Sequence, residues 1–312
     1  MSTAASAAAP SVVAVVVNYN GGAVTRACVE SLRASEGIVP RVVVVDNASA
    51  PGEQAALRSA HAESADVELI FLPENRHFAG GVNAGAARGL ALDAGYLLFL
   101  NNDTVLAPDC IRLLVEAAEQ DPGAGLVGPA LLDLRDPQRV LSLGERYSLW
   151  SICVPRSLVK VRSPGAGSPY PVGGIMGSVI MVSAPCFRRV GSYREDLRVY
   201  YEEVDYCLRA RALGYHPIIV PRAIARHDGL RGFTAGLQAY AAHLKARNML
   251  ILLRDYGRPL DWLGFLPTYA ALVLASAAIY ALRGDFAVVR ALFRGVADGM
   301  RALGEPAVRP AP

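Results

Sequence analysis

The chain has 312 residues, a formal net charge of +3 and 53% apolar residues. This length suits one large or two modest domains, and the apolar fraction exceeds the roughly 45–50% typical of soluble domains. Basic residues are not interleaved with aromatic ones, so no nucleic-acid-binding surface is expected. The five cysteines are widely scattered, which argues against a disulfide framework or a zinc site and favours reduced thiols in the cytosol.

The N-terminal half alternates apolar strand-like runs with helical segments. Strands are predicted at residues 11–17, 41–45, 66–72 and 96–100, and helices at 25–34, from 51, at 84–94 and at 108–120. This alternation predicts an α/β fold with a largely parallel sheet. Polar clusters follow the strands, and open α/β sheets bind ligands at the carboxyl ends of their strands.

The middle of the chain is less regular. Gly and Pro residues predict irregular structure or a hairpin at 123–168. Residues 172–182 are small and apolar, with glycines that include Gly174, and they predict a strand that another group approaches closely. A helix is then predicted at 201–213, followed by short strands at 216–220 and 223–227.

The C-terminal part is both apolar and basic. From residue 231 onward there are ten Lys/Arg and five Asp/Glu, so this part carries +5 and the remainder −2. Residues 263–282 are apolar and uncharged, long enough to span a bilayer, and the arginines that follow make in-plane amphipathic helices an equal alternative. We therefore expect a disordered N-terminus at 1–10, an α/β domain at 11–232 and a helical, membrane-associating region at 233–312.

A polar tetrad of residues 101–104 follows the predicted strand at 96–100. A divalent cation can neutralise the charge that develops on a departing nucleoside diphosphate, and it is commonly held by one or two oxygen ligands together with substrate phosphates. Asp103 is the carboxylate of this tetrad and lies beside Asn101 and Asn102. The alternative is a turn capped by Asn and Asp side chains.

His227 ends the last strand predicted before the C-terminal region. A neutral imidazole at a strand end can complete a metal site. A purely structural histidine is the alternative.

Three carboxylates, Glu202, Glu203 and Asp205, stand where a helix is predicted to begin. Their repulsion raises a pKa among them unless a cation intervenes, and a carboxylate of raised pKa suits a general base for an acceptor hydroxyl. The alternative is a solvated acidic helix start favoured by the macrodipole, with Asp205 paired to Arg209.

Residues 75–85 open a helix and include Gly80 and Gly81. Glycine lets backbone N–H groups approach a phosphate, and a helix N-terminus favours an anion. Arg76 can add a charge-assisted contact, and Asn83 lies in the same stretch. A helix-entry turn without a ligand is the alternative.

Two more strand ends carry polar side chains. Asn18, Tyr19 and Asn20 follow the first strand, and Asp46 and Asn47 follow the second. A carboxylate or amide after the second strand can accept the imide N–H of uracil or thymine, whereas a capped turn is the alternative.

The order of these segments is more specific than any one of them. The series VVVNYNG, VVVVDNAS, ENRHFAGGVNAG, LFLNNDT and YYEEVDYCLRARALGY with the downstream His227 resembles family 2 glycosyltransferases, in particular the bacterial branch of rhamnosyl- and galactofuranosyltransferases. The resemblance covers residues 12–228. It implies a GT-A domain at 11–232, a Rossmann-like, mixed and mostly parallel sheet flanked by helices.

The resemblance also implies roles on the donor side. Asn18, Tyr19 and Asp46 would contact the nucleoside. Asn101 and Asp103 stand at the DXD metal motif of the family, with Asn in place of the first Asp, and His227 stands at the metal-binding histidine. The donor-side residues are then Asn18, Tyr19, Asn20, Asp46, Asn47, Arg76, Gly80, Gly81, Asn83, Asn101 and Asn102, and the metal ligands are Asp103, His227 and Asn101.

On the acceptor side, Glu203 falls at the catalytic-base position, which is usually Asp in the family. Glu202 is its rival. Asp205 completes the catalytic group and, with Arg209 and Gly174, would organise the acceptor.

These roles imply an inverting glycosyltransferase that uses Mg²⁺ or Mn²⁺ and a dTDP- or UDP-sugar, with rhamnose or galactofuranose as the sugar. The basic, apolar tail favours a glycan or polyprenyl-linked acceptor of cell-envelope polysaccharide at the cytoplasmic face of the membrane. A non-catalytic sugar-nucleotide or glycan-binding subunit with the same fold is the alternative. A nucleotidyltransferase is disfavoured because residues 18–22 contain no Lys or Arg.

Overall fold

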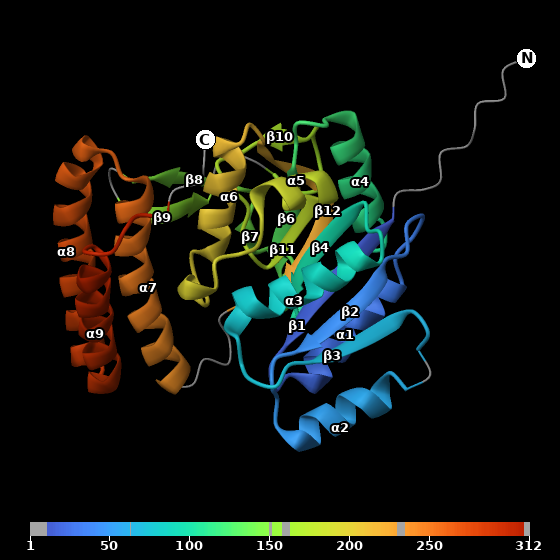
Figure 1. The fold of residues 1–312 in the computed structure, drawn as a ribbon, viewed down its shortest axis with the longest axis horizontal. Helices are drawn as coiled ribbons and strands as arrows, with labels where there is room; N and C mark the ends of the chain where they lie inside the picture. Colours follow the sequence, from blue (N-terminus) through green and yellow to red (C-terminus); the bar gives the residue numbers. More distant parts are fainter. Residues whose placement is uncertain (1–10, 63, 150–151, 158–162, 230–234, 309–312) are drawn as a thin grey trace, which may run out of the picture.

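The computed structural model describes residues 11–62, 64–149, 152–157, 163–229 and 235–308, so the expectation for residues 1–10 lies outside it. An α/β body forms one part of the molecule, and three C-terminal helices stand against one side of it (Figure 1). The mixed sheet has the strand order β10-β12-β6-β11-β4-β1-β2-β3, with β5 beside β12 and β7 beside β6. This arrangement confirms the predicted α/β class.

The sheet strands lie at Val12–Asn18 (β1), Arg41–Asp46 (β2), Val67–Phe71 (β3), Tyr96–Asn101 (β4), Thr104–Leu106 (β5), Leu126–Asp133 (β6), Val140–Ser142 (β7), Tyr170–Pro171 (β10), Val179–Ser183 (β11) and Pro217–His227 (β12). Within the described chain, β1 to β4, β6 and β12 run in one direction, and β11 runs antiparallel between β4 and β6. A separate hairpin pairs β8 (Glu145–Ser148) with β9 (Ile152–Ser157).

Helices cover both faces of the sheet. One face packs against α1 (Gly22–Arg33), α2 (Pro51–Ala60) and α4 (Cys110–Gln120). The other packs against α3 (His77–Ala91), α5 (Ala184–Val190) and α6 (Glu202–Ala212). A 3₁₀ turn, η1 (Glu195–Leu197), precedes α6. The near-continuous Val runs of β1 and β2 are buried because both faces of these strands are covered.

The expectation of irregular structure or a hairpin at 123–168 is confirmed by the β8–β9 hairpin but is wrong for β6, which is buried along its whole length inside the sheet. Pro129 lies opposite Val220, where the β12 register shifts by a bulge before Ile224. Proline cannot donate to a strand ladder and is tolerated at bulges. The same bulge joins the two short strands predicted at 216–220 and 223–227 into one strand.

The glycines of α3 bring this helix close to the sheet. Added Cβ atoms on Gly81, Gly85 and Gly89 would lie 2.6, 2.1 and 2.5 Å from side-chain carbons of β1 or β4. These glycines recur every four residues and so share one helix face. The helix begins at His77, earlier than predicted, because the glycine-rich stretch is itself helical.

Three helices follow the α/β body: α7 (Ala235–Tyr256), α8 (Pro259–Leu282) and α9 (Phe286–Ala302). Of the helices among the described residues, only α8 is long and apolar enough to cross a membrane. One side of α8 packs on the rest of the protein through Phe265, Tyr269 and Val273. Its other side leaves large apolar residues exposed, among them Leu260, Leu263, Leu274 and Leu282.

We expect Gly85→Ala to lower the free energy of unfolding by about 1–3 kcal/mol, the usual cost of overpacking a core. The reason is the 2.1 Å approach of its Cβ to Val15 Cγ1. Gly52→Ala in α2 is the matched control, because its Cβ would meet nothing within 4 Å. Urea unfolding of both variants checks this, and equal effects of the two substitutions would refute the packing role.

Candidate functional site

The carboxyl ends of four strands bring the predicted donor-side residues to one edge of the sheet. Asn18 at the end of β1 lies opposite Asp46 at the end of β2, and Asn101 on β4 lies opposite Val17. His227 ends β12 and pairs in register with Thr104. The topology therefore gathers residues that are up to two hundred positions apart in the sequence.

Asn18 anchors a buried polar network under the first loop. Its Nδ2 donates to Asp46 Oδ2 at 2.8 Å, and its Oδ1 accepts from Thr25 Oγ1 at 2.7 Å and Asn102 Nδ2 at 3.2 Å. Tyr19 lies next to it with 54% of its surface exposed. The network fixes the loop and leaves the tyrosine ring at the surface, and the nucleoside contact predicted for Tyr19 stays a prediction.

The glycine-rich stretch is tied to η1 by an ion pair. Arg76 Nη2 lies 2.5 Å from Glu195 Oε1, which also accepts from Asn83 Nδ2 at 3.0 Å. The hydrogen bond from Arg76 holds the pKa of Glu195 below its usual value. Asn47 Oδ1 accepts from the Arg76 backbone N–H at 2.9 Å. The phosphate contacts predicted for Arg76, Gly80 and Gly81 stay predictions beside this structural role.

His77 is the first residue of α3 and has a φ of +58°, in the left-handed region that favours glycine. Its backbone oxygen accepts from Asn47 Nδ2 at 2.7 Å. Its Nδ1 lies 2.9 Å from the Tyr240 hydroxyl, so it joins the start of α3 to α7.

The three predicted metal ligands lie close together, with Asp103 and Asn101 both near Nε2 of His227. His227 Nε2 lies 3.0 Å from Asp103 Oδ1 and 3.2 Å from Asn101 Nδ2. The described residues contain no group of three or more His, Cys, Asp or Glu side chains placed to hold a metal. A carboxylate, an imidazole and an amide are a partial ligand set, which fits a cation that completes its shell with phosphate oxygens.

Two consecutive residues connect this cluster to α6. Ser178 Oγ lies 3.5 Å from His227 Nδ1, and the Ser178 carbonyl accepts from the Asn101 N–H at 3.1 Å. A Cβ on Gly177 would lie 3.4 Å from Cβ and Cγ of Glu203. The histidine cluster and Glu203 thus lie against adjacent residues of one short segment, and Gly177 leaves room for the glutamate.

Glu202 and Glu203 have different surroundings, which the sequence could not distinguish. Glu202 is 4% exposed, and no described residue donates a hydrogen bond to its Oε2. Burial, reinforced by the charge of Glu203, raises the pKa of Glu202 well above its ordinary value. Glu203 is half-buried and faces a cavity, and burial raises its pKa while backbone N–H groups and Lys245 oppose the shift.

Asp205 and Arg209 belong to a buried ionic network. Asp205 Oδ2 accepts from Arg209 Nε at 2.8 Å, and its Oδ1 accepts from the Tyr256 hydroxyl at 2.6 Å. Arg194 Nη1 lies 3.3 Å from Asp205 and 2.6 Å from Asp255. Asp205 has no exposed surface, so its place is to hold α6 and α7 together behind Glu203.

The β8 strand lies against the glycines before β11. The Glu145 N–H donates to the Gly174 carbonyl at 2.9 Å, and a Cβ on Gly174 would overlap the ring of Tyr147. The close approach predicted for Gly174 is thus made by a tyrosine of the same chain, and its acceptor role stays a prediction.

Glu145 itself was not found from the sequence. It is 3% exposed, and burial raises the pKa of its carboxyl from 4.5 to about 7, with the Ser142 hydrogen bond opposing and the charge of Glu203 adding.

We expect Glu145→Gln to stabilise the protein in a pH-dependent way. Between pH 4.5 and about 7 the folded state holds a proton that the unfolded state has lost, so wild-type stability falls as the pH rises through this window. The glutamine has no proton to lose, and its Oε1 can still accept from Ser142 Oγ. Its gain should be near zero below pH 4.5 and reach up to about 3 kcal/mol above pH 7. Urea unfolding at pH 4.5 and 8 measures the difference, and an equal effect at both pH values would contradict it.

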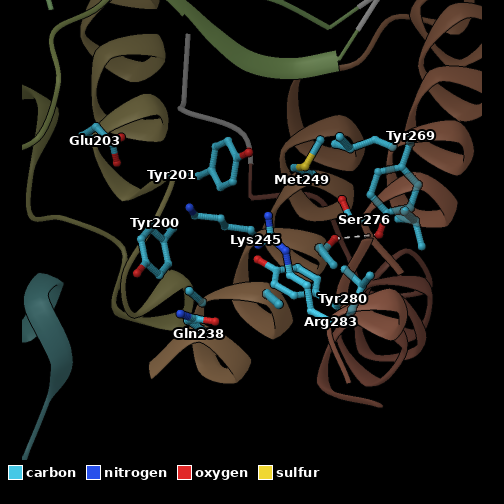
Figure 2. Close-up of a pocket in the computed structure, with 16 residues that line it drawn as sticks. Tyr200, Tyr201, Glu203, Gln238, Lys245, Met249, Tyr269, Ser276, Tyr280 and Arg283 are labelled. Carbon is cyan, nitrogen blue, oxygen red and sulfur yellow. Dashed lines mark hydrogen bonds between the residues drawn. The ribbon is translucent and has the colours of Figure 1, made fainter. Parts of the chain in front are cut away.

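A cavity of about 630 Å³ opens beside Glu203, between the start of α6 and the helices α7 and α8 (Figure 2). Lys245 extends into it toward Tyr200, with Nζ 4.6 Å from the centre of the tyrosine ring. Neither the cavity nor Lys245 was found from the sequence, because the lining comes from four separate helices, α6 to α9.

The fold can be compared with solved structures. The described fold is similar to GT-A glycosyltransferases: GalNAc-T7 solved with UDP, GalNAc and Mn²⁺ (TM-score 0.65, 13% identity, 81% of this chain and 49% of that chain) and a mannosyltransferase from Pyrobaculum calidifontis solved with GDP-Man and Mn²⁺ (TM-score 0.60, 17% identity, 95% and 87%). At such identities the likeness establishes the fold, which is the predicted GT-A fold.

The family follows from profile matches. The profile described as Glycosyl transferase family group 2 matches residues 96–292, and Glycosyl transferase family 2 matches residues 13–138. The chain belongs to the family 2 glycosyltransferases, as the sequence resemblance predicted.

Characterised relatives are similar over much of the chain. An N-acetylglucosaminyl-diphospho-decaprenol L-rhamnosyltransferase of Mycobacterium tuberculosis is 27% identical over 274 residues, which is 80% of this chain and 87% of the relative. A dTDP-rhamnosyl transferase of Shigella flexneri is 27% identical over 180 residues, 58% of this chain and 57% of the relative.

Proposed function

We propose that this glycosyltransferase transfers rhamnose, with inversion, from dTDP-rhamnose to a hydroxyl of a lipid-linked glycan at the cytoplasmic face of the membrane. The observation that carries the proposal is the placement of Glu203. Its side chain lines a cavity and lies 3.4 Å from the position of a Cβ on Gly177. The next residue, Ser178, has its Oγ 3.5 Å from Nδ1 of His227, which pairs with Asp103. A base and a leaving-group site in adjacent positions are what a single displacement requires.

The donor is bound along the carboxyl edge of the sheet. Tyr19 would face the nucleobase of the donor. Asp46, which accepts a hydrogen bond from Asn18, would lie below the nucleoside. The amide of Asn101 and the imidazole of His227 lie where the diphosphate would be placed. Asp103 and His227 would hold Mg²⁺ or Mn²⁺, which supplies positive charge against the departing diphosphate. The Mn²⁺ in the two similar solved structures supports a divalent cation.

Glu203 acts as the general base. Burial raises its pKa, which gives the carboxylate a greater affinity for the acceptor proton. Burial raises the pKa of Glu202 well above its ordinary value, which disfavours a second negative charge beside the base. The acceptor oxygen then attacks the anomeric carbon opposite the leaving group, and one displacement inverts its configuration.

The choice of sugar and acceptor is supported by the relatives. Two of them are named as rhamnosyltransferases, and one of these names a diphospho-decaprenol acceptor. The exposed apolar face of α8 and the exposed arginines of α9 favour in-plane contact with an anionic membrane. UDP-galactofuranose is the alternative donor within the same branch.

We expect Glu203→Gln to lower turnover by at least ~10²-fold, the low end for the loss of a general base. Glu202→Gln should retain most of the activity, because burial raises the pKa of Glu202 and so favours its neutral form, and a glutamine is close to that form in shape. The donor Kd of both variants should stay near that of the wild type. Single-turnover kinetics check this, and the reverse order of the two effects would move the base to Glu202.

A donor screen tests the proposal directly. We expect nucleoside diphosphate release and transfer with dTDP-rhamnose, loss of both with a chelator, and restoration by Mn²⁺ or Mg²⁺. Because the protein supplies only a partial ligand set, Mn²⁺ should bind much more tightly with dTDP present than alone. Asp103→Ala should abolish this dTDP-dependent binding. Calorimetry measures the binding, and full activity in chelator would rule out a metal-dependent enzyme.

A further inference from the structure

The cavity beside Glu203 has an apolar wall and a cationic edge. Ala246 and Met249 of α7 face Tyr269, Leu272 and Val273 of α8 across it. Figure 2 shows Lys245 extending between Glu203 on one side and Tyr280 and Arg283 on the other. A pocket of this size and lining is typical of a small amphiphilic ligand.

The two cations of the cavity are available to an anion. Within the described chain, neither Lys245 nor Arg283 forms a salt bridge. Burial lowers the pKa of Lys245, and the charge of Glu203 opposes this shift. Arg283 caps the C-terminal end of α8 and is exposed. A diphosphate between these side chains would be neutralised without breaking a salt bridge of either cation.

The apolar wall continues to the outer surface of the protein. Leu272 lines the cavity and is itself 38% exposed. Ile279, seven residues later and on the same face of α8, is 49% exposed. An apolar chain that begins in the cavity can therefore leave along α8 and enter a membrane that this face contacts.

We propose that this cavity binds the isoprenoid diphosphate part of the acceptor. Its diphosphate lies at Lys245 and Arg283, its first isoprene units lie on the α7–α8 wall, and its sugar reaches Glu203. The inference rests on the proposed function, because it gives the acceptor of that same site a binding place. The cavity presents Glu203, then the two cations, then the apolar wall. A prenyl-diphosphate-linked sugar presents its hydroxyl, its diphosphate and its prenyl chain in the same order. A phospholipid fits less well, because it has two chains and no sugar hydroxyl to present.

The test measures binding of geranylgeranyl diphosphate to the full chain in detergent. Ser276→Trp fills the cavity and should weaken binding at least about tenfold, whereas Ala278→Trp on the exposed side of α8 is the control. Arg283→Gln should weaken the binding of geranylgeranyl diphosphate about fivefold. It should leave the binding of geranylgeraniol unchanged, because that alcohol has no diphosphate. Arg290→Gln on α9 is the control. Neither control should change the affinity.

Wild-type affinity in Ser276→Trp and Arg283→Gln would overturn the inference. So would equal competition by phosphatidylglycerol vesicles, which would make the cavity a general lipid site. The binding needs no turnover, so its outcome is separate from that of the donor screen. Where transfer is observed, both variants should raise the KM for a prenyl-diphosphate acceptor and leave the KM for the donor unchanged.

Discussion

The side-chain amide of Asn248 on α7 donates to three backbone carbonyls of the loop that leads into α6. Its Nδ2 lies 2.9 Å from Leu197 O, 3.3 Å from Val199 O and 2.8 Å from Tyr200 O, and the side chain is fully buried. This loop contains three non-glycine residues with left-handed backbones, at positions 198, 200 and 201. Each costs of order 1–3 kcal/mol and persists only where its surroundings enforce it. The position of Glu202 and Glu203 at the start of α6 therefore depends on a residue in the C-terminal helices.

The ionic network around Asp205 also connects α6 to the C-terminal helix α7. Arg194 binds Asp205 of α6 and Asp255 of α7, and Tyr256 also reaches Asp205. A chain that ended near residue 228 would lose these contacts together with Asn248. The helices after residue 235 thus shape the loop that leads to Glu203 as well as carrying the apolar surface, and we propose that they act as one unit with the GT-A domain.

Much of the fold could be predicted from local patterns. The strands β1 to β4 and the helices beside them are continuous apolar runs or periodic segments, and tertiary contacts only adjusted their ends. The strand β6 was missed because Pro129 argues against a central strand, and only the bulge in its neighbour β12 accommodates it. The helix α3 starts earlier than expected because its glycines serve helix–sheet packing, a role that becomes visible only with Val15 and Val17 opposite them.

The residues of the candidate site also divide into those that could be predicted from the sequence and those that could not. Strand-end residues such as Asp46 and Asp103 could be placed from the sequence, because parallel strands deliver their carboxyl ends to one edge. The cavity and Glu145 could not, since burial and partner identity are set by segments far apart in the chain.

Electrostatics connects these parts of the site. Lys245 is the cation that opposes the raised pKa of Glu203, and among the described residues it has no salt-bridge partner. In the proposed acceptor complex, a diphosphate beside Lys245 would offset that positive charge. The proton affinity of Glu203 would then rise when an acceptor is present, and the carboxylate would be a stronger base at the moment it is needed. Burial raises the pKa of Glu202 and so favours its neutral form, which confines this change to the carboxylate of Glu203.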